Sequence, residues 1–116
     1  MTLDEYQRQA AQTDVFAHDG VTPRITDAAY VDKLLGLVGE SGEVAEKYKK
    51  ILRNNDGAIS EHDRIEITKE LGDVMWHIAL IARYLDTSLE DVAQANLAKI
   101  KDRTARDTIR SSGDER

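Results

Sequence analysis

Apolar side chains recur every three or four positions along most of this chain, and this spacing is the feature that most limits its fold. In the clearest run, the apolar positions are Tyr30, Leu34, Leu37, Val44, Tyr48, Ile51 and Leu52. Such a period places these side chains on one face of an α-helix. No long stretch alternates Val, Ile or Thr with polar residues, and there is one proline in 116 residues. The pattern therefore predicts an all-α protein.

Capping residues and helix breakers divide the chain into four predicted helices. A Ser or Thr followed three residues later by an acid opens three of them, and Asp27 precedes the other. The predicted helices cover about residues 3–13, 28–53, 61–85 and 89–103. Their short connections favour a four-helix bundle within one domain of residues 1–116. We place the core of that domain at about 28–103 and expect the polar tail at 104–116 to be flexible.

The third predicted helix is apolar almost all the way round. In VMWHIALIARYL, residues 74–85, ten of the twelve residues are apolar or aromatic, and the exceptions are His77 and Arg83. A helix of this kind is usually buried on more than one side, and so small a chain has little material to cover it. We therefore expect a second subunit to complete the bundle.

Composition excludes several classes of function. The net charge is −6 and there is no block rich in Lys or Arg, which argues against a nucleic-acid polymer as partner. The absence of cysteine excludes disulfides and thiolate metal sites. The N-terminus has no apolar signal segment, and no run approaches the roughly 18 apolar residues of a membrane span. We expect a soluble, cytoplasmic protein with no membrane contact.

Each of the two longest predicted helices carries one pair of acids spaced three residues apart. Glu40 and Glu43 lie at the edge of the apolar stripe in one helix, and Glu70 and Asp73 repeat the spacing in the next. Residues three apart share a helix face, so antiparallel packing can bring the two pairs together. The mutual repulsion of such carboxylates is relieved by protonation or by a metal ion. A cluster with oxygen ligands and no sulfur suits Mg²⁺ or Mn²⁺.

Three glycines, Gly36, Gly39 and Gly42, lie within the helix that carries the first acidic pair. Each weakens a helix by about 0.5–1 kcal/mol relative to alanine, so their presence beside the acids needs a reason. One hypothesis is that Gly39, Gly42 and Gly72 leave room for ions or a ligand. The other is that glycines permit close helix packing. Acids on a solvated helix face are also common, and spacing alone does not decide between that reading and a metal site.

The order of these motifs resembles a known family. The segments are GLVGESGEVAEKYKK, residues 36–50, and ELGDVMWHIALIARYLDTSLEDVAQANLAKIKDR, residues 70–103. They resemble the MazG-like family of all-α nucleoside triphosphate pyrophosphohydrolases over about residues 28–103. The family pattern of ExxE, a spacer and ExxD reads here as Glu-Ser-Gly-Glu and Glu-Leu-Gly-Asp. Many relatives have a further Glu where this chain has Gly39, which puts the substrate preference in doubt.

The resemblance implies hydrolysis of a nucleoside triphosphate to a monophosphate and pyrophosphate, in sanitation or control of the nucleotide pool. It implies Mg²⁺ as cofactor, with Mn²⁺ as a substitute, and a homodimer or dimer of dimers. The acids that would bind the metal and take part in catalysis are Glu40, Glu43, Glu70 and Asp73. Which of them acts as general base stays open, as does the base of the nucleotide.

Further residues are candidates around this site. Lys47 follows the first acidic pair by about one turn and is a candidate for a substrate phosphate. Asn96 and Lys99 match the Asn-x-x-Lys segment that relatives use near the substrate. Trp76 is expected in the core or an interface, and His77 beside the acids rather than as a Mg²⁺ ligand.

Two alternatives to catalysis stay open from the sequence. The chain could be a helical interaction module that keeps the bundle without the chemistry, or a sensor that binds a nucleotide without turnover. The intact four-acid motif favours the enzyme over both.

Overall fold

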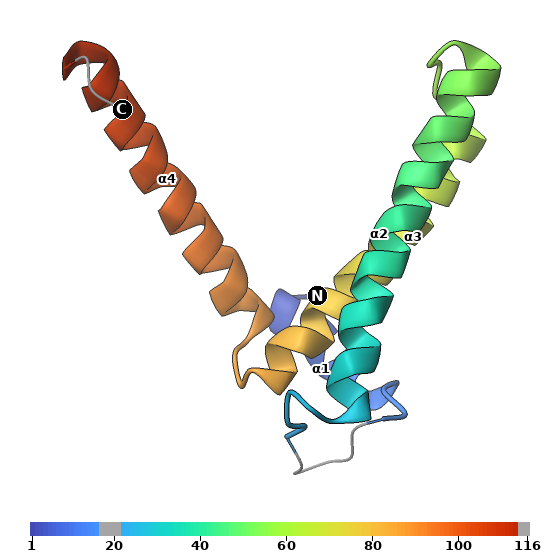
Figure 1. The fold of residues 1–116 in the computed structure, drawn as a ribbon, viewed down its shortest axis with the longest axis vertical. Helices are drawn as coiled ribbons and strands as arrows, with labels where there is room; N and C mark the ends of the chain where they lie inside the picture. The colour runs from blue at the N-terminus through green and yellow to red at the C-terminus, as the bar shows by residue number, and fades with distance from the viewer. Residues whose placement is uncertain (17–21, 114–116) are drawn as a thin grey trace.

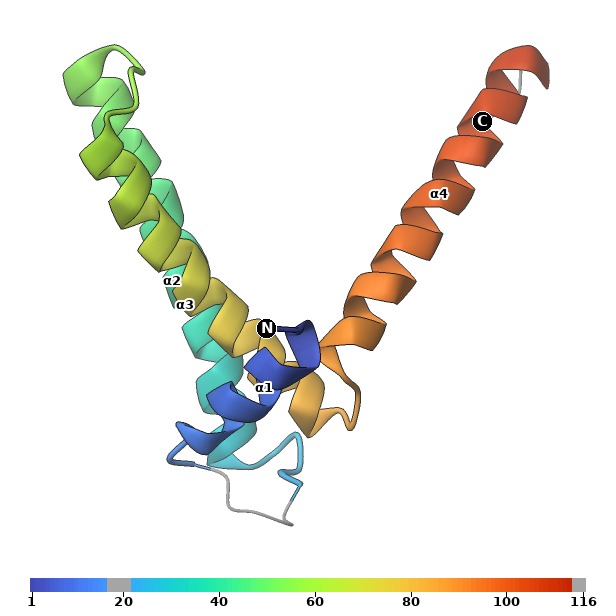
Figure 2. The same cartoon turned by 180° about the vertical axis from the view of Figure 1, so that it is seen from behind.

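The computed structural model describes residues 1–16 and 22–113, and within these ranges it contains helices and no strand. The helices are α1 Leu3–Gln12, α2 Ala28–Asn55, α3 Glu61–Tyr84 and α4 Leu89–Gly113. This confirms the all-α prediction. The antiparallel pair α2 and α3 forms one arm of a V, α4 forms the other, and α1 lies at the vertex (Figures 1 and 2). No described helix combines the length and apolarity needed to cross a membrane.

The helix starts follow the predicted caps. Thr2 and Ser60 form reciprocal capping boxes with Glu5 and Asp63, so that each side chain bonds the backbone N–H of the other residue. Asp27 precedes α2 as expected, but its carboxylate makes no capping bond to that helix. It accepts instead from a backbone N–H three residues upstream, at 2.7 Å. The sequence thus locates the starts of α1, α2 and α3, and the hydrogen bonding of the cap differs from the prediction at α2.

The prediction that the fourth helix ends near Arg103 is wrong, because α4 continues to Gly113. No Gly or Pro occurs between these two residues, so nothing in the sequence breaks the helix there. Arg106 also pairs with Asp102 one turn earlier, at 3.1 Å, which supports the extension. The predicted loop at 14–26 includes residues 17–21, and the predicted tail includes 114–116. Both of these segments lie outside the described residues.

A close approach between α2 and α3 depends on Gly36. A Cβ atom built on this glycine would lie 2.2 Å from Nε2 of His77. The His77 ring is held in place because Nδ1 lies 2.8 Å from the Asp73 carbonyl oxygen and the ring meets Trp76 edge-on. At Gly39, by contrast, an added Cβ would meet no described atom within 4 Å. Close packing therefore explains the first glycine and not the second.

A buried lysine lies at the vertex, and the sequence reading did not single it out. Lys33 of α2 is 1% exposed, and its Nζ lies 3.0 Å from Oδ1 of Asp14. The Tyr84 hydroxyl of α3 donates to the same carboxylate. The ring centroids of Phe16, Trp76 and Tyr84 lie 4.8, 5.4 and 6.0 Å from the ammonium. The signal was available, since Lys33 occupies a position on the apolar stripe of α2.

The direction of α4 is set by one buried glutamine of α1. The amide nitrogen of Gln7 donates to the carbonyl oxygens of Ala79 and Thr87, at 3.0 and 3.1 Å. Its amide oxygen accepts from the Leu89 backbone N–H at 3.1 Å. Gln7 therefore joins the last turns of α3 to the first turn of α4. The Ser88 hydroxyl completes this start, as predicted, by accepting from the backbone N–H three residues later.

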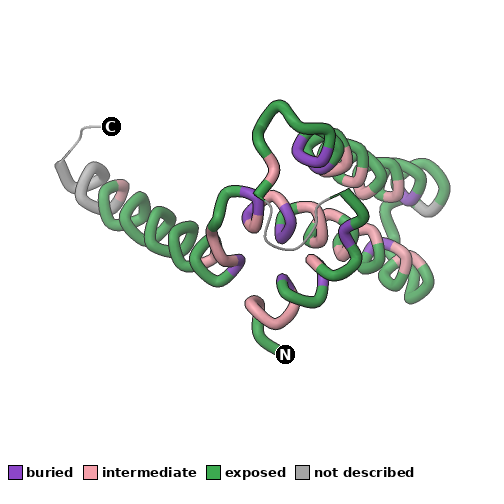
Figure 3. The backbone as a smooth tube through the Cα atoms, turned by 90° about the horizontal axis from the view of Figure 1, so that it is seen from below, coloured by how far each residue is buried: buried purple, intermediate pink, exposed green. Residues whose placement is uncertain are grey.

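The two arms of the V do not close into a bundle within one chain. Within the described residues α4 contacts α1 and α3 but not α2, and most of its length is exposed (Figure 3). Apolar side chains on both arms face solvent, including Leu97 on α4 at 53% and Val38 on α2 at 72%. Completion of the bundle by a second subunit stays a prediction.

We expect Gly36→Ala to destabilise the chain by about 1–3 kcal/mol, because the new methyl group overlaps the His77 ring and forces the two helices apart. The matched variant Gly39→Ala should stabilise it by about 0.5–1 kcal/mol, because nothing lies in the way of its methyl group. Chemical denaturation followed by circular dichroism measures both. The double variant Gly36→Ala/His77→Ala should recover part of the loss, and a loss that stays the same would contradict the overlap.

Candidate metal centre

Three carboxylates from α2 and α3 converge between the helices. One oxygen each from Glu40, Glu70 and Asp73 lies within 4.8 Å of the others. The two glutamates are half-buried and the aspartate is exposed. We refer to these three residues as the acidic cluster. It joins one residue of the first predicted pair with both residues of the second.

The helix register explains why these acids meet. The contact between Gly36 and His77 fixes α2 against α3. Four residues forward on α2 and four residues back on α3 bring Glu40 level with Asp73. One further turn along the same register brings Glu43 level with Glu70. Glu43 is nevertheless exposed and lies outside the acidic cluster.

The acidic cluster has the chemistry of a site for a hard divalent cation. Mg²⁺ takes oxygen ligands, keeps several waters and needs few protein carboxylates. Three carboxylate oxygens satisfy that requirement, and without a cation they repel each other. A Cβ added at Gly39, Gly42 or Gly72 would meet no described atom within 4 Å. The space beside the acids is therefore open, as the hypothesis of room for ions or a ligand requires.

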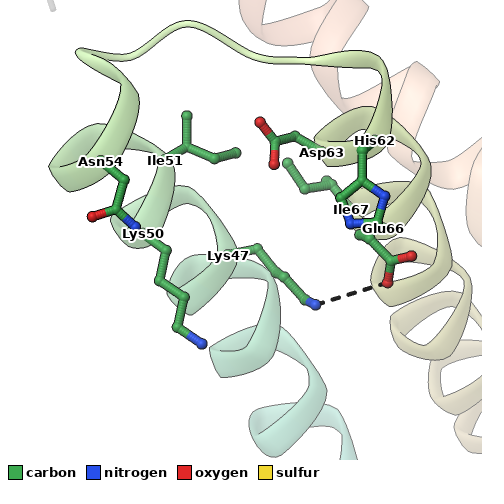
Figure 4. A pocket seen from close by; sticks show the side chains of 8 residues that line it. All are labelled: Lys47, Lys50, Ile51, Asn54, His62, Asp63, Glu66 and Ile67. Carbon is green, nitrogen blue, oxygen red and sulfur yellow. Dashed lines mark ion pairs between the residues drawn. The ribbon is translucent and has the colours of Figure 1, made fainter.

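Lys47 lies at one edge of the acidic cluster. Its Nζ is 3.9 Å from a carboxylate oxygen of Glu70 and 3.9 Å from one of Glu66. A hydrogen bond and the charge of Lys69 are the main causes that lower the pKa of Glu66, and the charge of Lys47 adds to them. Figure 4 shows Lys47 extending from α2 toward Glu66 on α3. Lys47 thus places a positive charge next to the predicted metal ligands.

A small cavity adjoins Lys47 toward the tip of the hairpin (Figure 4). Its volume is about 150 Å³. The lining combines two lysines and His62 with the carboxylates of Asp63 and Glu66. Because the charges are mixed, the cavity does not by itself indicate an anion or a cation as ligand.

Comparison with known proteins identifies the family of the chain. The family model of the MazG nucleotide pyrophosphohydrolase domain matches residues 31–106. The chain belongs to this family. It is similar to the Gene 37 protein of Mycobacterium phage L5, with 45% identity over 116 residues and all of both chains covered. No solved structure matches the chain.

Helix α1 lies outside the part of the chain that the MazG model matches, yet it approaches the acidic cluster. Burial, and after it the negative charge of Asp73, raises the pKa of Tyr6 in α1. The charge of the acidic cluster therefore reaches Tyr6, which the sequence did not single out. The resemblance began near residue 28 and gave no reason to look earlier. The relative in phage L5 aligns with α1 as well, since the alignment spans both chains completely.

Two predicted substrate contacts of the MazG segment lie away from the acids. Asn96 and Lys99 are exposed on α4, and no described residue of α4 contacts α2, which carries Glu40. One chain on its own therefore brings together Lys47 and three of the motif acids, but not Asn96 or Lys99.

We expect Mg²⁺ or Mn²⁺ to raise the melting temperature of the wild-type chain, because binding to the folded state alone adds about 2.7 kcal/mol at 100 times the dissociation constant. Glu70→Gln should lose most of this shift, and without metal it should be no less stable, since it has less carboxylate repulsion. Differential scanning calorimetry with and without a chelator measures both quantities.

Glu46→Gln is the matched control, because Glu46 is an exposed acid of the same hairpin outside the acidic cluster. It should respond to the ions as the wild type does. An equal metal-induced shift in Glu70→Gln would contradict metal binding at the acidic cluster. In the same experiment Glu43→Gln tests the fourth motif acid, since a reduced shift would identify Glu43 as a ligand.

Proposed function

We propose that this chain hydrolyses nucleoside triphosphates to a monophosphate and pyrophosphate, with Mg²⁺ held by Glu40, Glu43, Glu70 and Asp73. Mn²⁺ would substitute. The observation that carries the proposal is the convergence of three of these acids beside open space, in a chain of the MazG family. Such an activity would serve the sanitation or control of a nucleotide pool. A cytoplasmic location stays a prediction.

In the proposed reaction, the acids and Lys47 would have different roles because their charges differ. Bound Mg²⁺ would neutralise phosphate charge and make a water a better nucleophile at neutral pH. The acidic cluster provides several oxygens that accept hydrogen bonds, which orients a water toward the α-phosphorus. Lys47 would leave Glu70 and Glu66 to contact a phosphate oxygen, because a phosphate carries more charge than either carboxylate. Positioning and charge stabilisation then account for most of the rate enhancement over the uncatalysed reaction.

We further propose that two copies form the active unit, as a homodimer or a dimer of dimers. A helix gains most of its stability in a protein by packing an apolar face, and most of α4 has no such cover in one chain. Packing the α4 of one copy along the hairpin of another would cover the exposed apolar side chains of both arms. The same contact would carry Asn96 and Lys99 toward the acids of the second copy.

The test of the reaction is product analysis on a panel of ribo- and deoxynucleoside triphosphates with Mg²⁺, resolving pyrophosphate from single phosphate. We expect monophosphate and pyrophosphate in equal amounts. Glu70→Gln should lower kcat by about 100-fold or more, as expected when a group that stabilises transition-state charge is removed. Glu43→Gln tests the fourth acid, and Glu46→Gln should retain the wild-type rate.

Three outcomes would contradict the proposed reaction. Release of single phosphate would exclude attack at the α-phosphorus. Binding of a triphosphate without turnover, with Mg²⁺ or Mn²⁺ present, would indicate a nucleotide sensor. Neither binding nor turnover in a folded protein would indicate a non-catalytic interaction module.

Light scattering at micromolar concentration tests the assembly. We expect two or four times the monomer mass for the wild type, and a shift toward monomer for Leu97→Asp, because the new charge falls on the exposed apolar stripe of α4. Ala95→Asp is the matched control, since at 100° per residue it lies on nearly the opposite side of the helix. A monomeric wild type would contradict the proposed assembly. An equal loss of the oligomer in Leu97→Asp and Ala95→Asp would contradict it as well.

A further inference from the structure

A second hollow, of about 500 Å³, lies at the vertex of the V between α1 and the turn that joins α3 to α4. Figure 2 shows α1 at this vertex. The hollow is distinct from the acidic cluster, because its α3 residue Arg83 follows Asp73 by ten residues, about 15 Å along the helix. The MazG reaction proposed above uses no residue of its lining.

Two arginines from different helices line this hollow, Arg8 of α1 and Arg83 of α3. Neither guanidinium forms an ion pair or a hydrogen bond with another described residue, whereas Arg64 and Arg106 pair with acids on their own helices. Asp86 is the one carboxylate of the lining, so the net charge of the hollow is positive in a chain whose total charge is −6. Guanidinium groups bind phosphate oxygens in bidentate pairs.

Neutral donors lie beside the two arginines. The Thr87 hydroxyl, the backbone N–H of Ser88 and the side-chain amide of Gln12 have no hydrogen-bond partner among the described residues, and all three residues line the hollow. Thr87 and Ser88 are half-buried and Gln12 is exposed, and half-buried donors are normally paired with protein, water or ligand. Five donor groups from α1, α3 and the connecting turn thus surround one space.

We propose that this hollow binds a small phosphate ester of nucleotide size, without a metal ion. Arg8 and Arg83 hold the phosphate, and the Ser88 N–H and the Thr87 hydroxyl donate to its remaining oxygens. Asp86 accepts from a hydroxyl or amino group of the organic part. The volume falls within the roughly 300–1,000 Å³ typical of small-molecule sites. A hollow of this volume fits an organic phosphate ester such as a nucleoside monophosphate better than free phosphate.

A ligand in this hollow would stabilise the junction between the two arms of the V. Gln7, which precedes Arg8, holds the last turns of α3 and the first turn of α4 through three hydrogen bonds. A phosphate held by Arg8, Arg83 and Ser88 would span the same three segments. Binding should therefore raise the melting temperature.

The experiment is isothermal titration of the full chain with each of the four deoxynucleoside monophosphates and with inorganic phosphate, all in EDTA, with melting temperatures in parallel. The chelator separates this site from the acidic cluster, which repels phosphate unless a divalent ion is bound. We expect at least one monophosphate to bind and to raise the melting temperature. Arg8→Gln and Arg83→Gln should each weaken its binding at least tenfold.

Two control variants test whether the loss of monophosphate binding is specific to the arginines of this hollow. Arg53→Gln removes an exposed arginine at the far end of α2, and Glu70→Gln removes an acid of the acidic cluster. Both should bind the monophosphate as the wild type does, whatever their triphosphate hydrolysis. Circular dichroism verifies that the arginine variants are folded.

Failure of this proposal is distinct from failure of the proposed hydrolysis, which requires divalent ions. No binding of any monophosphate to the wild type would overturn it. Equal affinity in folded Arg8→Gln and Arg83→Gln would overturn it as well. If inorganic phosphate binds as tightly as every monophosphate, the inference of a nucleotide-sized ligand is wrong.

Discussion

The buried ion pair between Lys33 and Asp14 is the interaction on which the rest of the structure depends. Removing one partner of a buried ion pair costs about 3–5 kcal/mol. Oδ2 of the exposed Asp32 also lies 3.0 Å from the Lys33 ammonium and adds a second carboxylate to the pair. Burial by itself would raise the pKa of Asp14, but hydrogen bonds from the Tyr84 hydroxyl, the Phe16 backbone N–H and the lysine outweigh it and lower that pKa. The ammonium also faces three aromatic rings, which favour a desolvated cation. The end of α1, the first turns of α2 and the end of α3 are thereby fixed together.

Both arms of the V start from this fixed vertex. Along one arm, the glycine contact at Gly36 keeps α2 and α3 in a single register, and that register delivers Glu40 to Glu70 and Asp73. Along the other arm, Gln7 fixes where α4 begins. The acidic cluster is therefore positioned by packing that lies one or more turns away from it. Side chains outside the acidic cluster accordingly decide its geometry.

Local signals in the sequence were sufficient for the helix starts and for the spacing of the acids, but not for the end of α4. Capping boxes at Thr2 and Ser60 located helix starts, because both partners lie within one turn. The i,i+3 spacing of Glu70 and Asp73 placed these two acids of the acidic cluster on one helix face for the same reason. Long-range pairings were out of reach, such as the bond from Tyr84 to Asp14 across 70 residues. Lys33 is an intermediate case. A lysine on an apolar stripe predicts a buried acidic partner, but the sequence does not identify which acid it is.

The direction of α4 could not be predicted because it depends on tertiary hydrogen bonds and not on the helix itself. Its sequence specifies an amphipathic helix, and an amphipathic helix implies a surface that receives its apolar face. Within the chain only its first turns have such a surface, while Leu97 and Ile100 face solvent. On the opposite arm the acids, Gly39 and Val38 also border open space. One arm thus exposes an apolar helix face that lacks a packing partner. The other arm exposes the acidic cluster, which is open on one side. A second copy, packed arm to arm as proposed, would meet both requirements with one contact.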